Sequence, residues 1–287
     1  MDPSFVAGST PIIVAFMTFL TKLDAAVRAH DSIICVGLDP EPERIPAHLG
    51  TGAQAAVRFL RKIVNATGDR VCAYKPNLAF YERYGSAGAD ILALTLQSIP
   101  SDIPIILDGK RADVPNTATA YAHSLFERLK ADAATVPPYI GLDSIAPFCA
   151  AGYALVLART SNPGARDFQD LPIDGRPLYE HVVERVVAAF PAEVCGFVVG
   201  STYPAESKRI RALAPDRLFL MPGVGAQGGS LVDAVGAALD ARGGGVLPSS
   251  SRSVLYASAG TGFERAAAQA VDTLRRQANE ARQAGVR

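Results

Sequence analysis

The stretch IPIILDGKRAD, residues 103–113, places an apolar run directly in front of a cluster of charges. A short apolar run rich in β-branched residues, without polar alternation, is typical of a parallel strand covered on both faces. Two carboxylates and two cations follow within six positions, although like charges repel and unlike charges lose water when they meet. A strand that ends in such a cluster predicts a functional loop at the carboxyl end of a parallel sheet.

Seven further β-rich runs recur along the chain, at 32–39, 71–77, 134–141, 153–160, 194–201, 217–225 and 253–260. Segments with helical periodicity lie between them, such as residues 53–67 and the segment with Tyr121, Leu125 and Leu129 at four-residue spacing. Eight strands that alternate with helices over about 250 residues predict an α/β fold, a single-domain (β/α)8 TIM barrel. A doubly wound sheet is not favoured, because no GxGxxG follows the first run.

Glycine and serine mark the expected element boundaries near the C-terminus. Ser230 is predicted to cap a helix that ends at Gly243, and a last helix is predicted over about 261–283. The stretch GGGVLPSSSR, residues 243–252, is interpreted as a loop ahead of the eighth strand, because Gly, Pro and Ser dominate it.

Residues 1–16 are expected to be a leader or a flexible N-terminus ahead of a barrel domain over 17–287, with Met17 as the candidate native start. The apolar segment PIIVAFMTFL is too short to cross a membrane, and no Lys or Arg precedes it as in a signal peptide. The 28 basic residues balance the 28 acidic residues, which argues against nucleic acid or an anionic membrane as a partner.

Cysteine and histidine usage indicates no metal centre and no catalytic thiol. No CxxC pair occurs, and the four histidines form no ligand spacing. The cysteines lie far apart and three of them fall within apolar runs, which is typical of reduced, buried thiols in a cytoplasmic protein. They are Cys35, Cys72, Cys149 and Cys195.

Polar residues collect where the predicted strands end. Any one of them has a structural explanation, as a helix cap or a lysine that extends to solvent, but a solvated face would scatter its charges over helices. Gathered at strand ends, they predict one site at the mouth of the barrel. Arg111 is expected to point away from Lys110 and to be structural. The gathered residues are Asp39, Lys75, Asp108, Lys110, Asp113, Arg159, Ser161 and Arg252.

The glycine-rich stretch GVGAQGG, residues 223–229, follows the seventh predicted strand and brings backbone N–H groups close to an anion. Arg252 adds a guanidinium that grips a phosphate through two hydrogen bonds. Barrels commonly bind phosphate in the loops after strands seven and eight. Arg252 stands before, not after, the run assigned to strand eight.

Taken together, these motifs resemble those of the orotidine 5′-monophosphate decarboxylases, of the longer bacterial type. The resemblance covers residues 19–262 and departs from the family pattern at Ala112 and Pro115, which affect loop shape and not charge. It rests on VGLDP (36–40), YKPNLAFYE (74–82), LDGKRADVPNT (107–117), LARTSNPGARDFQ (157–169), PGVGAQGG (222–229) and SSSR (249–252).

The resemblance implies conversion of orotidine 5′-monophosphate into uridine 5′-monophosphate and CO2, without a metal or an organic cofactor. Lys110 would protonate C6, Asp108 would lie beside the substrate carboxylate, and Lys75 would complete an alternating row of charges. Asp113 and Thr117 would reach into the site of a second subunit, so the active form would be a homodimer.

The resemblance also implies the contacts with the nucleotide. Asp39 would bind the ribose hydroxyls and Ser161 the edge of the pyrimidine. Gln227 would contact both base and phosphate, and Arg252 would bind the phosphate.

Three alternatives stay open from the residues. The nearest is a Mg²⁺-dependent sugar-phosphate decarboxylase or aldolase of the same barrel superfamily, which places a metal-binding Glu where Lys75 stands. A Schiff-base aldolase would need a lysine with a lowered pKa, which flanking carboxylates oppose. The third alternative is a non-catalytic barrel that serves as a binding module.

Overall fold

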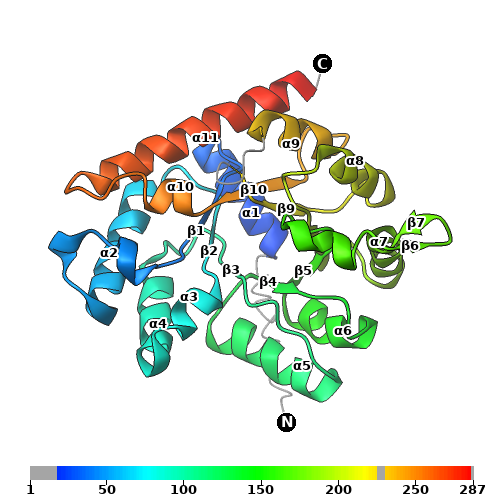
Figure 1. The fold of residues 1–287 in the computed structure, drawn as a ribbon, viewed down its shortest axis with the longest axis horizontal. Helices are drawn as coiled ribbons and strands as arrows, with labels where there is room; N and C mark the ends of the chain where they lie inside the picture. The colour runs from blue at the N-terminus through cyan, green and yellow to red at the C-terminus, as the bar shows by residue number, and fades with distance from the viewer. Residues whose placement is uncertain (1–17, 225–229, 286–287) are drawn as a thin grey trace, which may run out of the picture.

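The computed structural model describes residues 18–224 and 230–285. Eight parallel strands form one sheet in the order β2-β1-β10-β9-β8-β5-β4-β3, ringed by helices (Figure 1). The predicted (β/α)8 barrel is therefore confirmed. The strands are β1 Cys35–Gly37, β2 Ala73–Lys75, β3 Ile106–Leu107, β4 Ala133–Val136, β5 Tyr153–Leu157, β8 Cys195–Val198, β9 Phe219–Pro222 and β10 Val246–Ser250.

The barrel closes between β2 and β3 through isolated bridges and not through a continuous ladder. Tyr74 pairs with Ile105 and Asn77 pairs with Asp108, both in parallel orientation. The backbone N–H of Tyr74 donates to the Pro104 carbonyl at 3.0 Å, and further bonds join the same two segments near Asp108. The two strands that end in Lys75 and Asp108 therefore lie side by side.

The helices cover the outside of the barrel and α1 lies across its N-terminal end. The helix of residues 53–67 is confirmed as α2, and the one that contains Tyr121 changes from α-helix to a π-helical turn at His123. The α-helices are α1 Phe19–His30, α2 Gly52–Thr67, α3 Leu78–Glu82, α4 Gly88–Ser98, α5 Pro115–Ala122, α6 Leu142–Ala151, α7 Leu178–Ala189, α8 Pro204–Leu213, α9 Leu231–Ala238, α10 Arg252–Leu255 and α11 Phe263–Gly285.

Shorter elements lie in the connections. A two-stranded antiparallel hairpin, which was not predicted, interrupts the segment between β5 and α7. The short elements are β6 Pro172–Ile173, β7 Arg176–Pro177, the π-helical turn η4 His123–Arg128, and the 3-10 turns η1 Pro42–Arg44, η2 Ala47–Leu49, η3 Gly85–Ala87 and η5 Pro163–Asp167.

The predicted eighth strand over 253–260 is wrong. The strand is β10, Val246–Ser250, within the stretch that was interpreted as a loop, and the residues after it begin helix α10. Burial explains the difference, because every residue of β10 is buried and the strand pairs with β9 on one side and β1 on the other. Inside a closed barrel this burial outweighs the local turn preference of Pro248 and the serines.

Two elements end earlier than predicted, and the predicted cap of α9 is confirmed. The Ser230 hydroxyl accepts a hydrogen bond from the Asp233 N–H at 3.2 Å, so Ser230 caps α9. That helix ends at Ala238, well before Gly243. The strand predicted over 134–141 ends at Val136, where two prolines follow.

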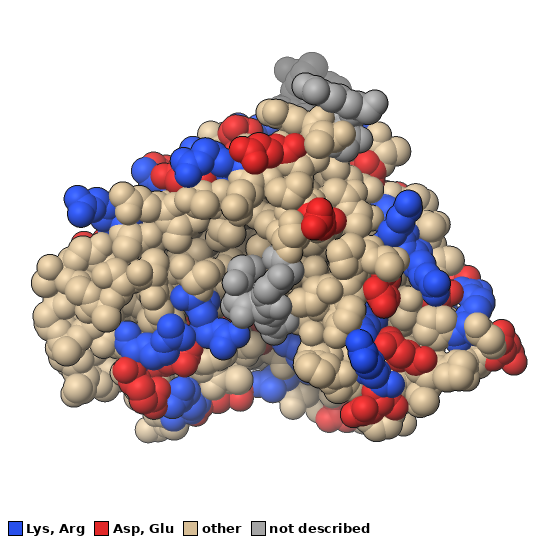
Figure 2. All heavy atoms as spheres, turned by 45° about the horizontal axis from the view of Figure 1, so that its top comes forward, with Lys and Arg blue, Asp and Glu red and all other residues tan. Residues whose placement is uncertain are grey.

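Apolar side chains from alternate strand positions fill the barrel, and α1 covers them from the N-terminal end. Phe19 of α1 packs its ring 4.8 Å from that of Tyr153. All four cysteines are free and buried, as predicted. Basic and acidic side chains are interspersed on the face seen in Figure 2. Within residues 18–224 and 230–285 no helix combines the length and the apolar character that a membrane crossing requires.

Candidate active site

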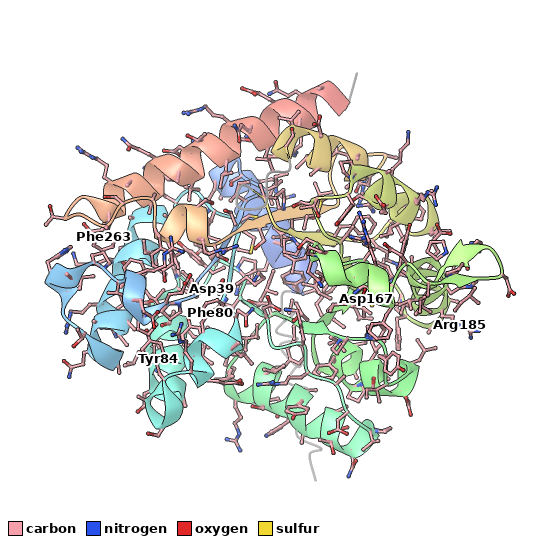
Figure 3. All side chains as sticks on the ribbon, in the orientation of Figure 1. Asp39, Phe80, Tyr84, Asp167, Arg185 and Phe263 are labelled. Atoms are coloured by element: carbon pink, nitrogen blue, oxygen red, sulfur yellow. The ribbon has the colours of Figure 1, made fainter. Side chains whose placement is uncertain are left out.

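A cavity of about 350 Å³ opens at the carboxyl ends of the barrel strands. Asp39 and Phe80, both labelled near the centre of Figure 3, line it from the segments that follow β1 and β2. A parallel barrel brings the ends of distant strands together at one mouth, which is why separate motifs meet here. Five of the predicted site residues line this cavity, namely Asp39, Lys75, Asp108, Ser161 and Arg252.

The Asp108 carboxylate lies between two ammonium groups. Lys75 Nζ donates to Asp108 Oδ2 at 2.9 Å, and Lys110 Nζ donates to Asp108 Oδ1 at 2.7 Å. The two lysines differ in exposure, because 6% of the Lys75 side chain is accessible to solvent and 46% of the Lys110 side chain. The predicted alternation of charges over Lys75, Asp108 and Lys110 is therefore present within one chain.

Burial and neighbouring charges set the protonation of this row. Burial alone would raise the pKa of Asp108, but Lys75 and Lys110 outweigh it and hold that pKa well below its usual range. Burial would lower the pKa of Lys75, but Asp108 and Asp39 outweigh it and raise that pKa. Burial raises the pKa of Asp39, and the Lys75 ammonium opposes this rise. Asp108 and Lys75 are thus both charged at neutral pH.

Two polar side chains that the sequence analysis did not select complete the shell around Asp108. Thr135 Oγ1 donates to Asp108 Oδ1 at 2.8 Å and accepts a hydrogen bond from the Lys110 N–H at 3.1 Å. Asn77 Nδ2 lies 3.4 Å from Asp108 Oδ2. The only sequence signal for either was a polar residue within or just after a strand-like run.

Asp39 is fixed by the segments after β2 and β10. Its Oδ1 accepts a hydrogen bond from the Asn77 N–H at 3.0 Å. The Tyr256 hydroxyl donates to the Asp39 carbonyl at 3.0 Å and accepts from the Glu41 N–H at 2.6 Å. Tyr256 follows α10, so it joins the segment that carries Arg252 to the segment that carries Asp39.

A buried arginine, Arg159, lies two residues before Ser161 at the edge of the cavity. Arg159 Nε and Nη2 donate to the two oxygens of Asp170 at 3.2 and 2.9 Å, and its guanidinium lies 3.7 Å from the centre of the Tyr203 ring. On the other side, a Cβ atom at Gly200 would lie 2.6 Å from the Ser161 nitrogen, so only glycine fits there. The close approach of Gly200 therefore restricts the backbone at Ser161, and the contacts of Arg159 anchor the segment that precedes it.

Arg252 lies at the cavity directly after the eighth strand. It is the first residue of α10, two positions beyond the end of β10. Because the eighth strand is Val246–Ser250, Arg252 lies in the loop after strand eight, where barrels commonly bind phosphate. Gln227, predicted to contact base and phosphate, lies outside the described residues.

Asp113 and Thr117 do not line the cavity of their own chain. Asp113 is partly buried just before α5, where its Oδ1 accepts a hydrogen bond from the Val114 N–H at 2.7 Å. The Thr117 hydroxyl lies 3.4 Å from Asn116 Oδ1. Arg111 contacts the Glu82 carboxylate and lies over the Tyr121 ring, so it points away from Lys110 as expected.

The described part of the chain holds no group of three or more His, Cys, Asp or Glu side chains that could bind a metal ion. The polar groups at the mouth are instead cations paired with single carboxylates, together with hydroxyls. Such a set can bind an anionic ligand and donate a proton to it. A parallel barrel with this set at its mouth is a (β/α)8-barrel enzyme.

Comparisons with known proteins name the family. A profile of the orotidine 5′-phosphate decarboxylase / HUMPS family matches residues 32–280. The orotidine 5′-phosphate decarboxylase of Herpetosiphon aurantiacus is 47% identical over 253 residues, which cover 87% of this chain and 93% of that protein. The one of Thermomicrobium roseum is 46% identical over 281 residues, 94% of this chain and all of that protein. The chain belongs to the orotidine 5′-phosphate decarboxylase / HUMPS family.

Solved structures support the same family. The OMP decarboxylase of Leishmania donovani superposes with a TM-score of 0.78 at 36% identity, covering 90% of this chain and 99% of that one. The UMP synthase of Leishmania donovani superposes with a TM-score of 0.84 at 38% identity, covering 92% of this chain but 56% of that longer one. The alternative of a non-catalytic binding module is wrong, because this chain matches nearly the whole length of relatives that are named as decarboxylases.

Proposed function

We propose that this protein converts orotidine 5′-monophosphate into uridine 5′-monophosphate and CO2, a step of pyrimidine biosynthesis. The observation that carries the proposal is the row Lys75, Asp108 and Lys110 at the barrel mouth, within a chain of this family. The cavity volume of about 350 Å³ falls within the roughly 300–1,000 Å³ of small-ligand sites.

The chemistry requires a cation at one place. Loss of CO2 leaves the bonding electron pair on C6, in the plane of the ring, where the pyrimidine π system cannot delocalise it. A fixed ammonium stabilises the resulting carbanion and then donates the proton that replaces the carboxylate. Lys75 lines the cavity, but its ammonium is buried and paired with Asp108, and Lys110 does not line the cavity. We assign this role to Lys110, as the family resemblance implies, because its ammonium bonds Asp108 at 2.7 Å and is the more accessible of the two.

Asp108 has a second effect on the bound substrate. Two unit charges about 4 Å apart interact by roughly 4 kcal/mol at an effective dielectric constant near 20, so a substrate carboxylate placed beside Asp108 is repelled on that scale. The repulsion ends when the carboxylate departs as neutral CO2. We give this ground-state effect less weight than stabilisation of the carbanion by Lys110, which acts in the transition state itself.

The rest of the nucleotide is assigned to the remaining cavity residues. Asp39 binds the ribose hydroxyls, Ser161 the pyrimidine edge, and Arg252 the phosphate, with Gln227 as a second contact to base and phosphate. The position of Arg252 after the eighth strand supports the phosphate assignment. Binding energy from the phosphate, which does not react, holds the ring against the charged row.

The active form in this proposal is a homodimer, in which Asp113 and Thr117 complete the partner's site. Both residues lie outside the cavity of their own chain. Val114, next to Asp113, is 54% exposed, and Tyr139, which precedes the helix α6 that packs against α5, is 91% exposed. Exposed apolar groups beside residues with no role in their own site support a surface that a second copy covers.

The metal-dependent alternative places a metal-binding carboxylate at the end of β2. Lys75 stands there instead, 2.9 Å from Asp108, and a buried ammonium disfavours a divalent cation beside it. A Schiff-base aldolase would need a lysine with a lowered pKa, whereas that of Lys75 is raised. The proposal therefore includes activity without a metal or organic cofactor, and location in the cytoplasm, which the four free, buried cysteines support.

The test is loss of orotidine 5′-monophosphate absorbance on addition of the purified protein, with uridine 5′-monophosphate and CO2 identified as products. Turnover should persist after dialysis against EDTA. It should be absent in Lys110→Ala and unchanged in Lys208→Ala, an exposed lysine on α8. Absence of turnover by the wild type refutes the proposal, and turnover that requires Mg²⁺ favours the metal-dependent alternative.

A further inference from the structure

We infer that Thr135 is a positioning residue for the decarboxylation, because its buried hydroxyl ties the backbone of Lys110 to the carboxylate of Asp108. The inference rests on the proposed function and concerns a residue of β4, a strand that supplies none of the groups assigned above. Thr135 does not contact the cavity. Its effect on the reaction therefore passes through the two residues that it joins.

The geometry of the Thr135 hydroxyl leaves it little freedom. It donates its hydrogen to Asp108 Oδ1 at 2.8 Å and accepts the Lys110 N–H at 3.1 Å, and only 1% of the residue is accessible to solvent. A hydroxyl offers one donor, and here that donor is directed to a carboxylate while its lone pair receives an amide. Valine has nearly the same shape as threonine but offers neither bond.

Lys110 needs such a tie because its backbone is unusual. Its φ angle is +46°, in the left-handed region that residues with a side chain rarely adopt. This conformation turns the Lys110 side chain back toward Asp108, two residues earlier, and its Nζ reaches Oδ1 at 2.7 Å. The preceding residue, Gly109, is confined by Leu78, whose Cδ1 would lie 2.7 Å from a Cβ at that position.

The hydroxyl also completes the bonding of the carboxylate. Asp108 Oδ2 accepts from Lys75 and lies near the Asn77 amide, while Oδ1 accepts from Lys110 and Thr135. Both oxygens thus have partners from two directions, which fixes the plane of the carboxylate. Without Thr135, Oδ1 keeps only the half-exposed Lys110 ammonium, and both the carboxylate and the lysine lose their fixed orientation.

Other buried threonines in the described chain show what a structural role looks like. The hydroxyl of Thr95 donates to the Ile91 carbonyl at 2.7 Å, within its own helix. That bond satisfies a buried polar group, and Thr95 does not line the cavity. Thr95→Val is therefore a matched control for Thr135→Val, since both changes replace a buried hydroxyl with a methyl group.

The experiment compares Thr135→Val, Thr135→Ser and Thr95→Val with the wild type. For Thr135→Val we expect kcat to fall roughly 10- to 100-fold, the effect of one hydrogen bond to a charged group. KM and the affinity for uridine 5′-monophosphate should stay within about twofold, because the nucleotide contacts are unchanged. Thr135→Ser should recover most of the kcat, and Thr95→Val should keep all of it.

Amide hydrogen exchange gives a second readout that does not depend on turnover. The Lys110 amide should exchange at least about tenfold faster in Thr135→Val than in the wild type, because its acceptor is removed. Unchanged kcat and unchanged exchange in Thr135→Val, or a stability loss in that variant with wild-type kcat per folded molecule, would overturn the inference. If the wild type fails to decarboxylate but the exchange difference is present, the proposed function fails and the tie between Thr135 and Lys110 stands.

Discussion

Lys75 and Lys110 donate to opposite oxygens of one carboxylate, that of Asp108, at 2.9 and 2.7 Å. The first ammonium is buried and the second is half-exposed, so the two lysines make the same kind of ion pair but differ in their access to solvent. The buried ammonium of Lys75 borders the cavity, and its ion pair holds the Asp108 carboxylate in place. An accessible ammonium can transfer its proton, and this asymmetry separates the two roles.

The two lysines should respond differently to substitution. Lys110→Ala should lower turnover by at least about 100-fold, as expected for loss of a general acid. Its stability should change by no more than about 1 kcal/mol, because a half-exposed pair contributes little. Lys75→Ala removes the partner of a buried charge and should lose about 3–5 kcal/mol of stability as well as activity. Turnover assays and urea unfolding check both, and equal stability losses would contradict the assignment.

The stability of the wild type should depend on Asp108 in acid. The folded-state pKa of Asp108 lies below its ordinary value, so the unfolded chain takes up a proton first as the pH falls. The stabilisation from Asp108 is therefore complete above about pH 5 and is lost as the pH falls toward the lower pKa of the folded state. Asp108→Asn lacks this contribution. The difference in unfolding free energy between wild type and Asp108→Asn should shrink between pH 5 and pH 3; a constant difference would refute this.

Arg252 should contribute to binding and not to proton transfer. Arg252→Ala should raise KM by roughly 10- to 100-fold, the effect expected when one charged hydrogen-bonding group is lost from a phosphate site. Arg252→Lys keeps the positive charge but loses the planar guanidinium, so its KM should lie between those of the wild type and Arg252→Ala. Steady-state kinetics with orotidine 5′-monophosphate provide the measurement, and an unchanged KM in Arg252→Ala would remove Arg252 from the phosphate site.

The shared site predicts complementation between two inactive variants. In a mixed dimer of Lys110→Ala and Asp113→Ala, one of the two sites has an intact Lys110 and receives an intact Asp113. Random reassortment should restore about a quarter of wild-type activity, since half of the dimers are mixed and each has one intact site.

The control for complementation mixes Lys110→Ala with Asp108→Ala. Both residues belong to the same site, so every site in a mixed dimer carries one substitution and no activity should return. Recovery in this control, or none in the first mixture, would show that Asp113 does not act in the partner's site.

Much of the barrel could be predicted from the sequence because its strands are buried on both faces. Runs such as 153–160 therefore read as continuous apolar segments, and the charges that follow them marked the mouth. The eighth strand was misplaced because the segment with Pro248 has the composition of a turn, and its strand conformation depends on pairing with β9 and β1. Such pairing is a tertiary effect that local composition does not carry.

The site was predicted less completely than the fold. The charged residues of the row stood out because charges after apolar runs are rare. Thr135 and Asn77 did not, since a single hydroxyl or amide in a strand region carries no periodic signal, and its partners are distant in sequence. Arg159 was noticed at a strand end, but its contacts with Asp170 and Tyr203 depend on how two later loops fold back over β5.

The barrel closes between β2 and β3 through isolated bridges, and the ion pair of Lys75 and Asp108 lies at the carboxyl ends of these two strands. The ion pair between Lys75 and Asp108, which belongs to the proposed active site, therefore also helps to keep the barrel closed. A designer who wished to give this scaffold another reaction would first have to strengthen the contact between β2 and β3, for example by lengthening β3. Only then could Lys75 or Asp108 be exchanged. In this barrel the freedom to alter chemistry is limited by the architecture that the same side chains maintain.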